Sequence, residues 1–298
     1  MTDAAPDRPK LRVGAADPAG ILEEPDAHVW GGGARRGPDG RFYHVYARWA
    51  VEHGFDAWVT HSHLGWAVAD SPFGPWDVQG VLIGHRDAWD QVLHNPDLHV
   101  FDGRYSLYYT ANHGNGDWWT HRNHQRIGVA VADHPAGPWQ RFDKPLIDVE
   151  PGTQDHLMTA HPAVARGRDG RYDLIYKSIS DGPAPFGGRV RWRVAIADHP
   201  LGPFHKQPEP IFDHPTAAFP ADDTYLWHQG DRYYAIVKDQ GGYFSDYNAG
   251  KALLLFESTD GLHYAPVDQP LLMTFDLPWT NGRVSRGLTR VDEPNVLL

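Results

Sequence analysis

The segment ADHPAGPW at residues 132–139 has two close relatives in the same chain, ADSPFGPW at 69–76 and ADHPLGPF at 197–204. The three copies are offset by 63 and 65 residues, and a degenerate fourth copy, ESTDGLHY, follows at 257–264. Self-similarity at a nearly constant period of this size is the signature of a repeat architecture. We therefore expect four copies of one structural unit.

An apolar hairpin precedes each copy. Alternating apolar and aromatic residues flank an Asp-Gly or Gly-Asp pair, which is a strong short-range signal for a tight turn between two antiparallel strands. The four hairpins are GPDGRFYHVYARW (37–49), HVFDGRYSLYYTAN (99–112), ARGRDGRYDLIYKS (165–178) and LWHQGDRYYAIVKD (226–239). A third strand leads into each repeated segment and an outer strand follows it. The result is a four-stranded meander, the unit of a β-propeller blade.

The sequence therefore predicts an all-β fold, a five-bladed β-propeller with four complete blades. The inner strands begin near Pro25, Asn95, His161 and Asp222, and EPNVLL at 293–298 has the pattern of a fifth inner strand. The fifth blade is expected to be partial, truncated or completed by another chain. We expect residues 1–22 to form an N-terminal extension and residues 23–298 to form one propeller domain without long helices.

Composition limits the partners of the chain. Its 298 residues include 27 Lys and Arg against 38 Asp and Glu, and the net charge of −11 argues against nucleic acid or an anionic membrane as a partner. Neither a signal peptide nor a membrane span is predicted, because no long apolar segment is present. With no cysteine, the chain has no thiolate nucleophile. We expect a cytoplasmic protein that acts on a small solute and could form a homo-oligomer.

The starts of the inner strands are expected to meet at one end of the propeller axis. They would bring several carboxylates and imidazoles into one funnel, namely Asp26, His28, His94, Asp97, His161, Asp222 and Asp223. Carboxylates that share such a site have different pKa values, as a general acid and a general base require. In the alternative interpretation, each Asp simply accepts hydrogen bonds from backbone N–H groups of a turn.

The long loops after the second strands are expected on the same face and are rich in aromatic residues. These residues are Trp49, Trp58, Trp118, Trp119, Phe186, Tyr243 and Tyr247. Aromatic rings beside polar groups suit a sugar, because its C–H face stacks on an indole while its hydroxyls bind amides and carboxylates. Trp30, Trp118 and Trp119 are therefore candidate substrate-binding residues. Alternatively, the rings pack the loops against one another.

Three cations share one register at the ends of the second strands: Arg48, Lys177 and Lys238. Two interpretations remain open. The cations pair with the funnel aspartates and neutralise them, or they bind an anionic group of the substrate, such as a uronate carboxylate.

Two further patterns point to no cofactor. The triplet Gly31-Gly32-Gly33 is not a phosphate-binding loop, because no helix follows it. The many histidines fit no compact zinc motif, so we predict no catalytic metal and no required cofactor. An axis lined by His and Asp could nevertheless hold a structural divalent cation.

The segment HNPDLHVFDGRYSLYYT (94–110) resembles the second-blade motif of glycoside hydrolase family 43. The inner hairpins of the other blades resemble those of family 43 and of family 117, and the resemblance covers about residues 23–298. It implies a five-bladed propeller and a glycosidase with three acidic residues. They are a base or nucleophile Asp in blade one, an orienting Asp in blade three and a general-acid Glu in blade four.

Residue by residue, the resemblance places Asp26 on the blade-one carboxylate. Asp222 stands where the general-acid Glu is expected, and His161 stands where the blade-three Asp is expected. The missing carboxylate could be supplied by Asp97 or Asp155, or His161 could itself donate a proton, because an unperturbed imidazole has a pKa of about 6.5.

The leading prediction is an exo-acting glycoside hydrolase that releases one terminal sugar, which could be anionic or anhydro, from a small oligosaccharide. Asp26 is predicted to activate water and Asp222 to protonate the leaving oxygen, while Asp97, His94 and His161 tune or orient them. Two alternatives are a non-catalytic sugar-binding propeller and a glycoside phosphorylase. The phosphorylase would hold phosphate on the cations Arg48, Lys177 and Lys238.

Overall fold

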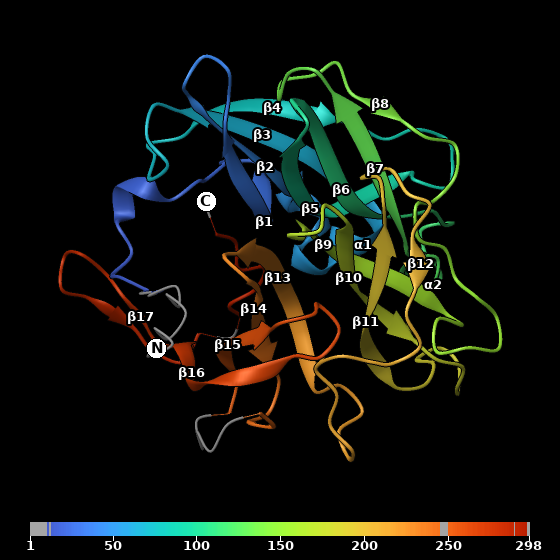
Figure 1. Cartoon of the computed structure of the whole chain (residues 1–298). Helices are drawn as coiled ribbons and strands as arrows, with labels where there is room; N and C mark the ends of the chain where they lie inside the picture. The colour runs from blue at the N-terminus through green and yellow to red at the C-terminus, as the bar shows by residue number, and fades with distance from the viewer. Residues whose placement is uncertain (1–10, 12, 245–249, 289, 297–298) are drawn as a thin grey trace.

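Four antiparallel sheets of four strands each surround a common centre in the computed structural model (Figure 1). The structure describes residues 11, 13–244, 250–288 and 290–296. In every sheet, strands that are consecutive in the sequence are hydrogen-bonded neighbours. The predicted all-β propeller with four complete blades is therefore confirmed.

Each blade runs from an inner strand at the centre to an outer strand at the rim. Blade 1 contains β1 (Ala27–Arg36), β2 (Phe42–Ala50), β3 (His63–Ala69) and β4 (Asp77–Ile83). Blade 2 contains β5 (Val92–Phe101), β6 (Arg104–Asn112), β7 (Arg126–Ala132) and β8 (Gln140–Arg141). Blade 3 contains β9 (Met158–Arg166), β10 (Tyr172–Ile179), β11 (Val190–Ala197) and β12 (His205–Lys206). Blade 4 contains β13 (Ala221–Gln229), β14 (Arg232–Asp239), β15 (Ala252–Ser258) and β16 (Ala265–Thr274).

Helices are short throughout the described residues, as predicted. They are η1 (Pro18–Gly20), η2 (Val51–His53), η3 (Phe55–Ala57), α1 (Trp58–His61) and α2 (Trp118–Asn123). Among the described residues, no helix has the length and apolar character needed to cross a membrane.

The repeated segment forms the same turn in three blades. Gly74, Gly137 and Gly202 have φ angles of +76°, +87° and +78°, and each is followed by a cis-proline. Only glycine adopts this left-handed backbone without strain. The sequence repeat therefore corresponds to a conformational repeat.

Apolar side chains fill the spaces between neighbouring blades. Successive residues of a strand point to opposite faces of its sheet, so each sheet contributes to two layers. One layer joins blades 1 and 2 through residues such as Leu64 and Leu98, the next joins blades 2 and 3, and the third joins blades 3 and 4. The free face of blade 4, which includes Trp227, is packed by Leu11, Val291 and Val296 instead of another sheet.

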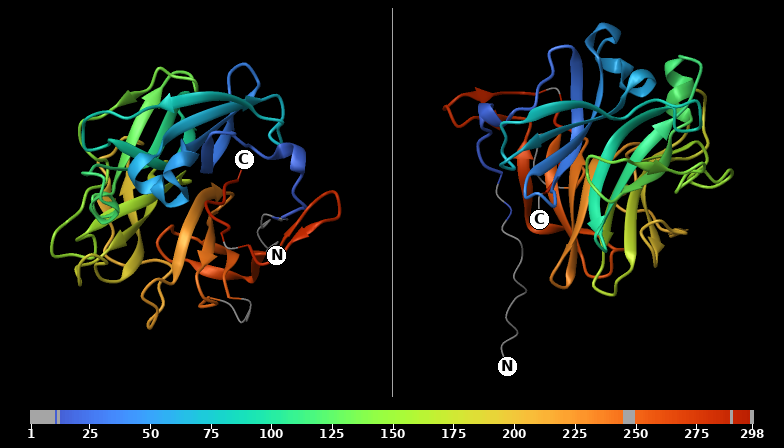
Figure 2. Two further views of the ribbon diagram at one scale, coloured as in Figure 1. Left: turned by 180° about the vertical axis from the view of Figure 1, so that it is seen from behind. Right: turned by 90° about the horizontal axis from the view of Figure 1, so that it is seen from above.

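The predicted fifth blade is not confirmed. Residues 293–296 form no strand, and residues 297 and 298 lie outside the described residues. Between blades 4 and 1 the structure has a two-stranded hairpin, β17 (Leu277–Pro278) and β18 (Val284–Ser285), with Ala16 bridged in parallel to Trp279 (Figures 1 and 2). From this hairpin the chain turns inward, and residues 290–296 run along the centre of the molecule between β1 and β13 (Figure 1).

The glycine triplet of β1 makes room for this C-terminal segment. A Cβ atom on Gly31 would overlap the carboxylate of Glu293, and one on Gly33 would overlap the side chain of Asn295. These glycines are thus required by close packing of chain against chain, and not by a phosphate group.

We predict that Gly31→Ala lowers the free energy of unfolding more than Gly103→Ala does. Both glycines have positive φ, +65° and +79°, but a Cβ on Gly103 meets nothing within 4 Å. Each variant should lose about 1–2 kcal/mol from the left-handed backbone, and Gly31→Ala should lose more because it also displaces Glu293. Urea unfolding measures both losses, and equal values would contradict this role for Gly31.

Candidate active site

The four inner strands carry a bulge at the same position. In each blade two residues of the inner strand face one residue of the second strand, which is the pattern of a β-bulge. The first bulged residues are Gly31, Asn95, His161 and Asp223 in blades 1 to 4. The three non-glycine members have φ of 48°, 54° and 40°, a conformation that is uncommon without glycine.

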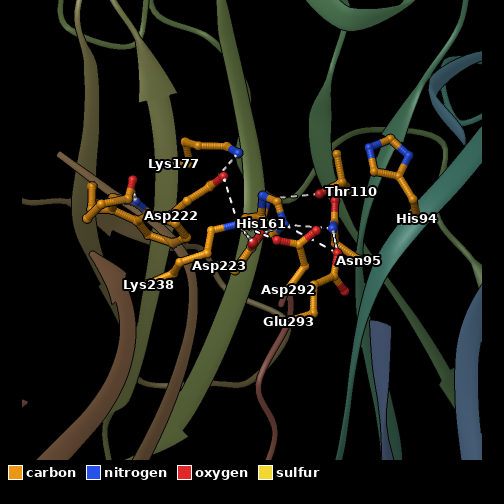
Figure 3. A network of polar contacts seen from close by, with 12 residues as sticks. His94, Asn95, Thr110, His161, Lys177, Asp222, Asp223, Lys238, Asp292 and Glu293 are labelled. Atoms are coloured by element: carbon orange, nitrogen blue, oxygen red, sulfur yellow. Dashed lines mark hydrogen bonds and ion pairs between the residues drawn. The ribbon is translucent and has the colours of Figure 1, made fainter. Parts of the chain in front are cut away.

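These bulges turn side chains towards the centre, where they meet Glu293 of the C-terminal segment (Figure 3). Nε2 of His161 donates to Oδ1 of Asp223 at 2.9 Å and lies 3.4 Å from Oε1 of Glu293. Asn95 donates its side-chain N–H to the same Glu293 oxygen. Because Gly31 has no side chain, Glu293 takes the place that a side chain of blade 1 would occupy.

The two carboxylates change the acidity of the central imidazole. Burial lowers the pKa of His161 and Lys177 lowers it further, but Asp223 and Glu293 outweigh both and raise it to about 9. His161 is therefore an imidazolium at neutral pH, held by carboxylates from two other parts of the chain.

Beside this contact, two lysines hold a cluster of aspartates (Figure 3). Nζ of Lys177 donates to Oδ1 of Asp222 at 2.8 Å, and Gln240 donates to the other Asp222 oxygen at 3.1 Å. Nζ of the buried Lys238 donates to Asp223 and to Asp292, and it lies 3.6 Å from Asp222.

The acidic groups of the cluster differ in proton affinity. Burial, followed by the charge of Asp223, raises the pKa of Asp292 to about 6, although Lys238 opposes this rise. Burial also raises the pKa of Asp223, but His161 and Lys238 more than compensate and hold that pKa well below its usual range. Neighbouring carboxyl groups with separated pKa values are typical of acid–base sites.

The cluster forms the floor of a pocket of about 460 Å³. Its carboxylates are Asp222, Asp223 and Asp292, and Trp30 and Trp58 line it as a pair of rings in edge-to-face contact with centroids 5.5 Å apart. The other lining residues include Phe219, Gln240, Lys251, Phe275 and Arg290. A pocket with aromatic walls and a charged floor is the form expected of a small-molecule site.

The structure brings about half of the predicted site residues to this pocket. They are Trp30, His161, Lys177, Asp222, Asp223 and Lys238. Lys177 and Lys238 pair with aspartates, which is the first of the two interpretations of the cations. Arg48 lies apart from them and binds both carboxylate oxygens of Glu24, at 2.5 and 2.8 Å.

Asp26 does not join the pocket. Its side chain is exposed, and the bulge alignment matches Gly31, five residues further along the chain, with His161 and Asp223. In blade 1 the bulge lies after the Glu24-Pro25 pair, whereas in blades 2 and 3 it includes the proline itself. The predicted convergence of Asp26 with the other carboxylates is therefore not observed.

Neither Asp97 nor Asp155 lines this pocket. Asp97 joins blades 2 and 3, and Asp155 binds side chains within blade 3. Oδ2 of Asp97 accepts from the backbone N–H of Val164 in the next blade at 2.9 Å and contacts Nε2 of His99 at 2.8 Å. Asp155 is buried and accepts from the Tyr176 hydroxyl at 2.8 Å.

The remaining predicted residues surround the pocket without lining it. His94 is buried under Trp58 and hydrogen-bonded to Gln125, and burial first, then the positive groups nearby, keeps its pKa well below the usual value. His28 packs against Trp49 and Phe55. Trp118 and Trp119 lie on the rim beyond Trp58. Trp49 is fully buried, and Tyr247 lies outside the described residues.

The sequence prediction missed Asn95, Asp292 and Glu293 as site residues. One signal could have found two of them. Asn95, His161 and Glu293 each precede a proline at the start of a predicted inner strand, in the sequences NPD, HPA and EPN. In blades 2 and 3 the bulged residue that points to the centre is the one before that proline.

Among the described residues, His161, Asp223 and Glu293 form a group that could hold a cation, since one potential ligand atom from each lies within 4.8 Å of the others. An imidazole with two carboxylates is a donor set that divalent metals accept. His161 would have to lose its Nε2 proton first, because that proton is shared with Asp223.

No protein-family model and no curated protein matches the chain. Several solved structures, however, match the chain. Zg3597, a family 117 glycoside hydrolase produced by the marine bacterium Zobellia galactanivorans, is 20% identical with a TM-score of 0.62, over 89% of this chain and 77% of that chain. A thermostable family-43 glycoside hydrolase is 11% identical with a TM-score of 0.60, over 88% of this chain and 77% of that chain.

An endo-arabinase from Bacteroides thetaiotaomicron is 13% identical with a TM-score of 0.54, over 91% of each chain. At these identities the likeness concerns the fold. The resemblance to the propellers of glycoside hydrolase families 43 and 117 is confirmed at that level.

We predict that Asp97→Asn destabilises the protein without abolishing its chemistry. The amide keeps an acceptor for the Val164 N–H but loses the negative charge beside His99 and buries an NH2 group where Oδ1 has no hydrogen-bond partner, so the free energy of unfolding should fall by about 1–3 kcal/mol. Urea unfolding measures the loss. A normally stable variant that loses its turnover would instead make Asp97 catalytic.

Lys238→Met should cost about 3–5 kcal/mol of unfolding free energy, because it removes the cation that Asp223 and Asp292 share inside the protein. Lys251→Met is the matched control, since Lys251 lines the same pocket but is exposed. If Lys238→Met were as stable as the wild type and lost affinity only for anionic sugars, the lysine would serve the substrate and not the aspartates.

Proposed function

We propose that the protein is a glycoside hydrolase whose reaction takes place in the pocket between Trp30, Trp58 and the aspartate cluster. The observation that carries this proposal is the meeting of Asp222 and Asp292 at one ammonium group, Lys238 Nζ, in a pocket that Trp30 and Trp58 also line. The matched solved structures that are named as glycosidases support the reaction class.

Hydrolysis of a glycosidic bond uses two carboxyl groups that flank the scissile bond. One protonates the leaving oxygen, and the other attacks the sugar or activates water. We assign this pair to Asp222 and Asp292, which come from blade 4 and from the C-terminal segment. Lys177 and Gln240 orient Asp222, and Lys238 orients both carboxyl groups.

His161 is proposed as a positioning residue. It replaces the acidic residue that the family resemblance implies in blade three, and its imidazolium holds Asp223 against Lys238. The charge of Asp223 in turn raises the proton affinity of Asp292. The blade-three position therefore acts on the carboxyl pair through Asp223 and not by direct contact with substrate.

We further propose exo action on one terminal sugar of an oligosaccharide, because the segment that carries Asp292 and Arg290 bounds the pocket on one side. A neutral sugar agrees better with the site than an anionic one, because Lys177 and Lys238 already have carboxylate partners. The same pairing argues against a phosphorylase.

A structural divalent cation on His161, Asp223 and Glu293 is a separate proposal. Metal analysis of the purified protein, and its melting temperature with and without EDTA, would test it. None of the chemistry assigned to Asp222 and Asp292 depends on such an ion.

The experiment is a panel of aryl glycosides and oligosaccharides with a reducing-sugar readout, run on the wild type and on three variants. Asp222→Asn and Asp292→Asn should each lower turnover by at least about 100-fold, the usual range for loss of a catalytic acid or base. Asp26→Asn should keep near-normal turnover, because Asp26 is exposed and outside the pocket.

Absence of hydrolysis by the wild type, with sugar binding retained, would favour the non-catalytic sugar-binding propeller. Loss of turnover in Asp26→Asn alone would restore the blade-one carboxylate as the base and remove Asp292 from the pair.

A further inference from the structure

A row of aromatic rings leads away from the pocket across the rim of blades 1 to 3. We call Trp58, Trp118, Trp119 and Phe186 the aromatic track. The rings follow one another in edge-to-face contact, with centroid separations of 6.0, 4.8 and 4.8 Å. The first member also lines the pocket, so the track and the pocket form one continuous surface.

Hydrogen bonds to the backbone of neighbouring loops hold the track in place. Nε1 of Trp118 donates to the carbonyl of Asp56 at 3.0 Å and ties α2 to the loop of blade 1. Arg122 donates to the carbonyl of Phe186, also at 3.0 Å, and its guanidinium lies over the ring of Trp119. Asn123 donates to the neighbouring Pro185 carbonyl. Three loops from three blades are thus joined into one ordered rim.

Burial does not explain the outer end of the track. Phe186 is 62% exposed, whereas Trp49, at the end of β2, is fully buried. Packing loops together would favour covered rings such as that of Trp49. Phe186 is exposed, and Trp58, Trp118 and Trp119 are half-buried. Apolar surface that stays open to solvent on an ordered scaffold marks an interaction site.

The continuity of the track with the pocket identifies its occupant. This step rests on the proposed glycosidase function, in which the terminal sugar lies beside Trp30 and Trp58. The rest of an oligosaccharide must then leave the pocket, and the track begins at the pocket wall. Sugar rings stack on aromatic rings through their C–H faces.

We propose that the aromatic track is an extended subsite that binds the second and following sugar units of an oligosaccharide, with Phe186 at its far end. The enzyme therefore prefers longer oligosaccharides to short glycosides, and this preference is set on the rim and not in the pocket.

Affinity electrophoresis in gels containing arabinan, xylan or agarose tests the proposal without relying on catalysis. The wild type should be retarded by at least one of these polysaccharides. Phe186→Ala and Trp119→Ala should weaken that binding about three- to tenfold, the equivalent of one lost aromatic contact. Phe186→Trp should restore it. Phe73→Ala is the matched control, because Phe73 is 78% exposed on blade 1 and lines a different pocket.

Kinetics on the same variants provide a second readout. The ratio of kcat/KM for a long oligosaccharide to that for a short glycoside should fall in Phe186→Ala. An unchanged ratio and unchanged gel retardation would overturn the extended subsite even if short glycosides are still cleaved. Retardation lost in Phe186→Ala without any hydrolysis by the wild type would contradict the proposed reaction and leave the subsite standing.

Size-exclusion chromatography decides the remaining alternative. If the wild type were a dimer that Phe186→Ala converts to a monomer, the track would be a contact between two copies of the chain. That result would overturn the subsite proposal.

Discussion

The buried ammonium group of Lys238 is the contact on which the centre of the molecule depends. It joins Asp222 and Asp223 of β13 to Asp292 of the C-terminal segment. Buried carboxylates without a cation would be costly, so the same contact that stabilises the centre also brings the acidic groups of the pocket together. Stability and chemistry are therefore coupled at this residue.

The bulges of the inner strands determine what reaches this ammonium group. A regular strand would alternate its side chains between the two faces of the blade and direct none of them along the axis. One extra residue per strand re-aims a side chain, and here it turns His161 and Asp223 to the centre. In blade 1 the bulged residue is Gly31, which leaves space for Glu293. The centre is thus shared among several segments that are distant in the sequence.

Much of the fold could be predicted from local patterns. The Asp-Gly turns and the repeated GPW-like segments depend on residues close in the sequence, so the four blades followed from them directly. The course of residues 290–296 could not be predicted, because DEPNVLL has the same pattern as an inner strand and only its contacts with Gly31 and Gly33 place it along the axis. Asp222 and Lys238 are cross-strand partners in one predicted hairpin, so their proximity follows from local sequence. Asp292 reaches them only through the course of the C-terminal segment. Asp26 is exposed outside the pocket, because the bulge of blade 1 falls at Gly31.

The central claim is that one sugar lies between the tryptophan pair and the carboxyl groups of Asp222 and Asp292. The most direct measurement is a crystal structure of the Asp222→Asn variant soaked with an oligosaccharide that the wild type cleaves. The account predicts a terminal sugar against Trp30 and Trp58, with its glycosidic oxygen within hydrogen-bond distance of residue 222 or of Asp292. An oligosaccharide bound away from both residues would contradict it.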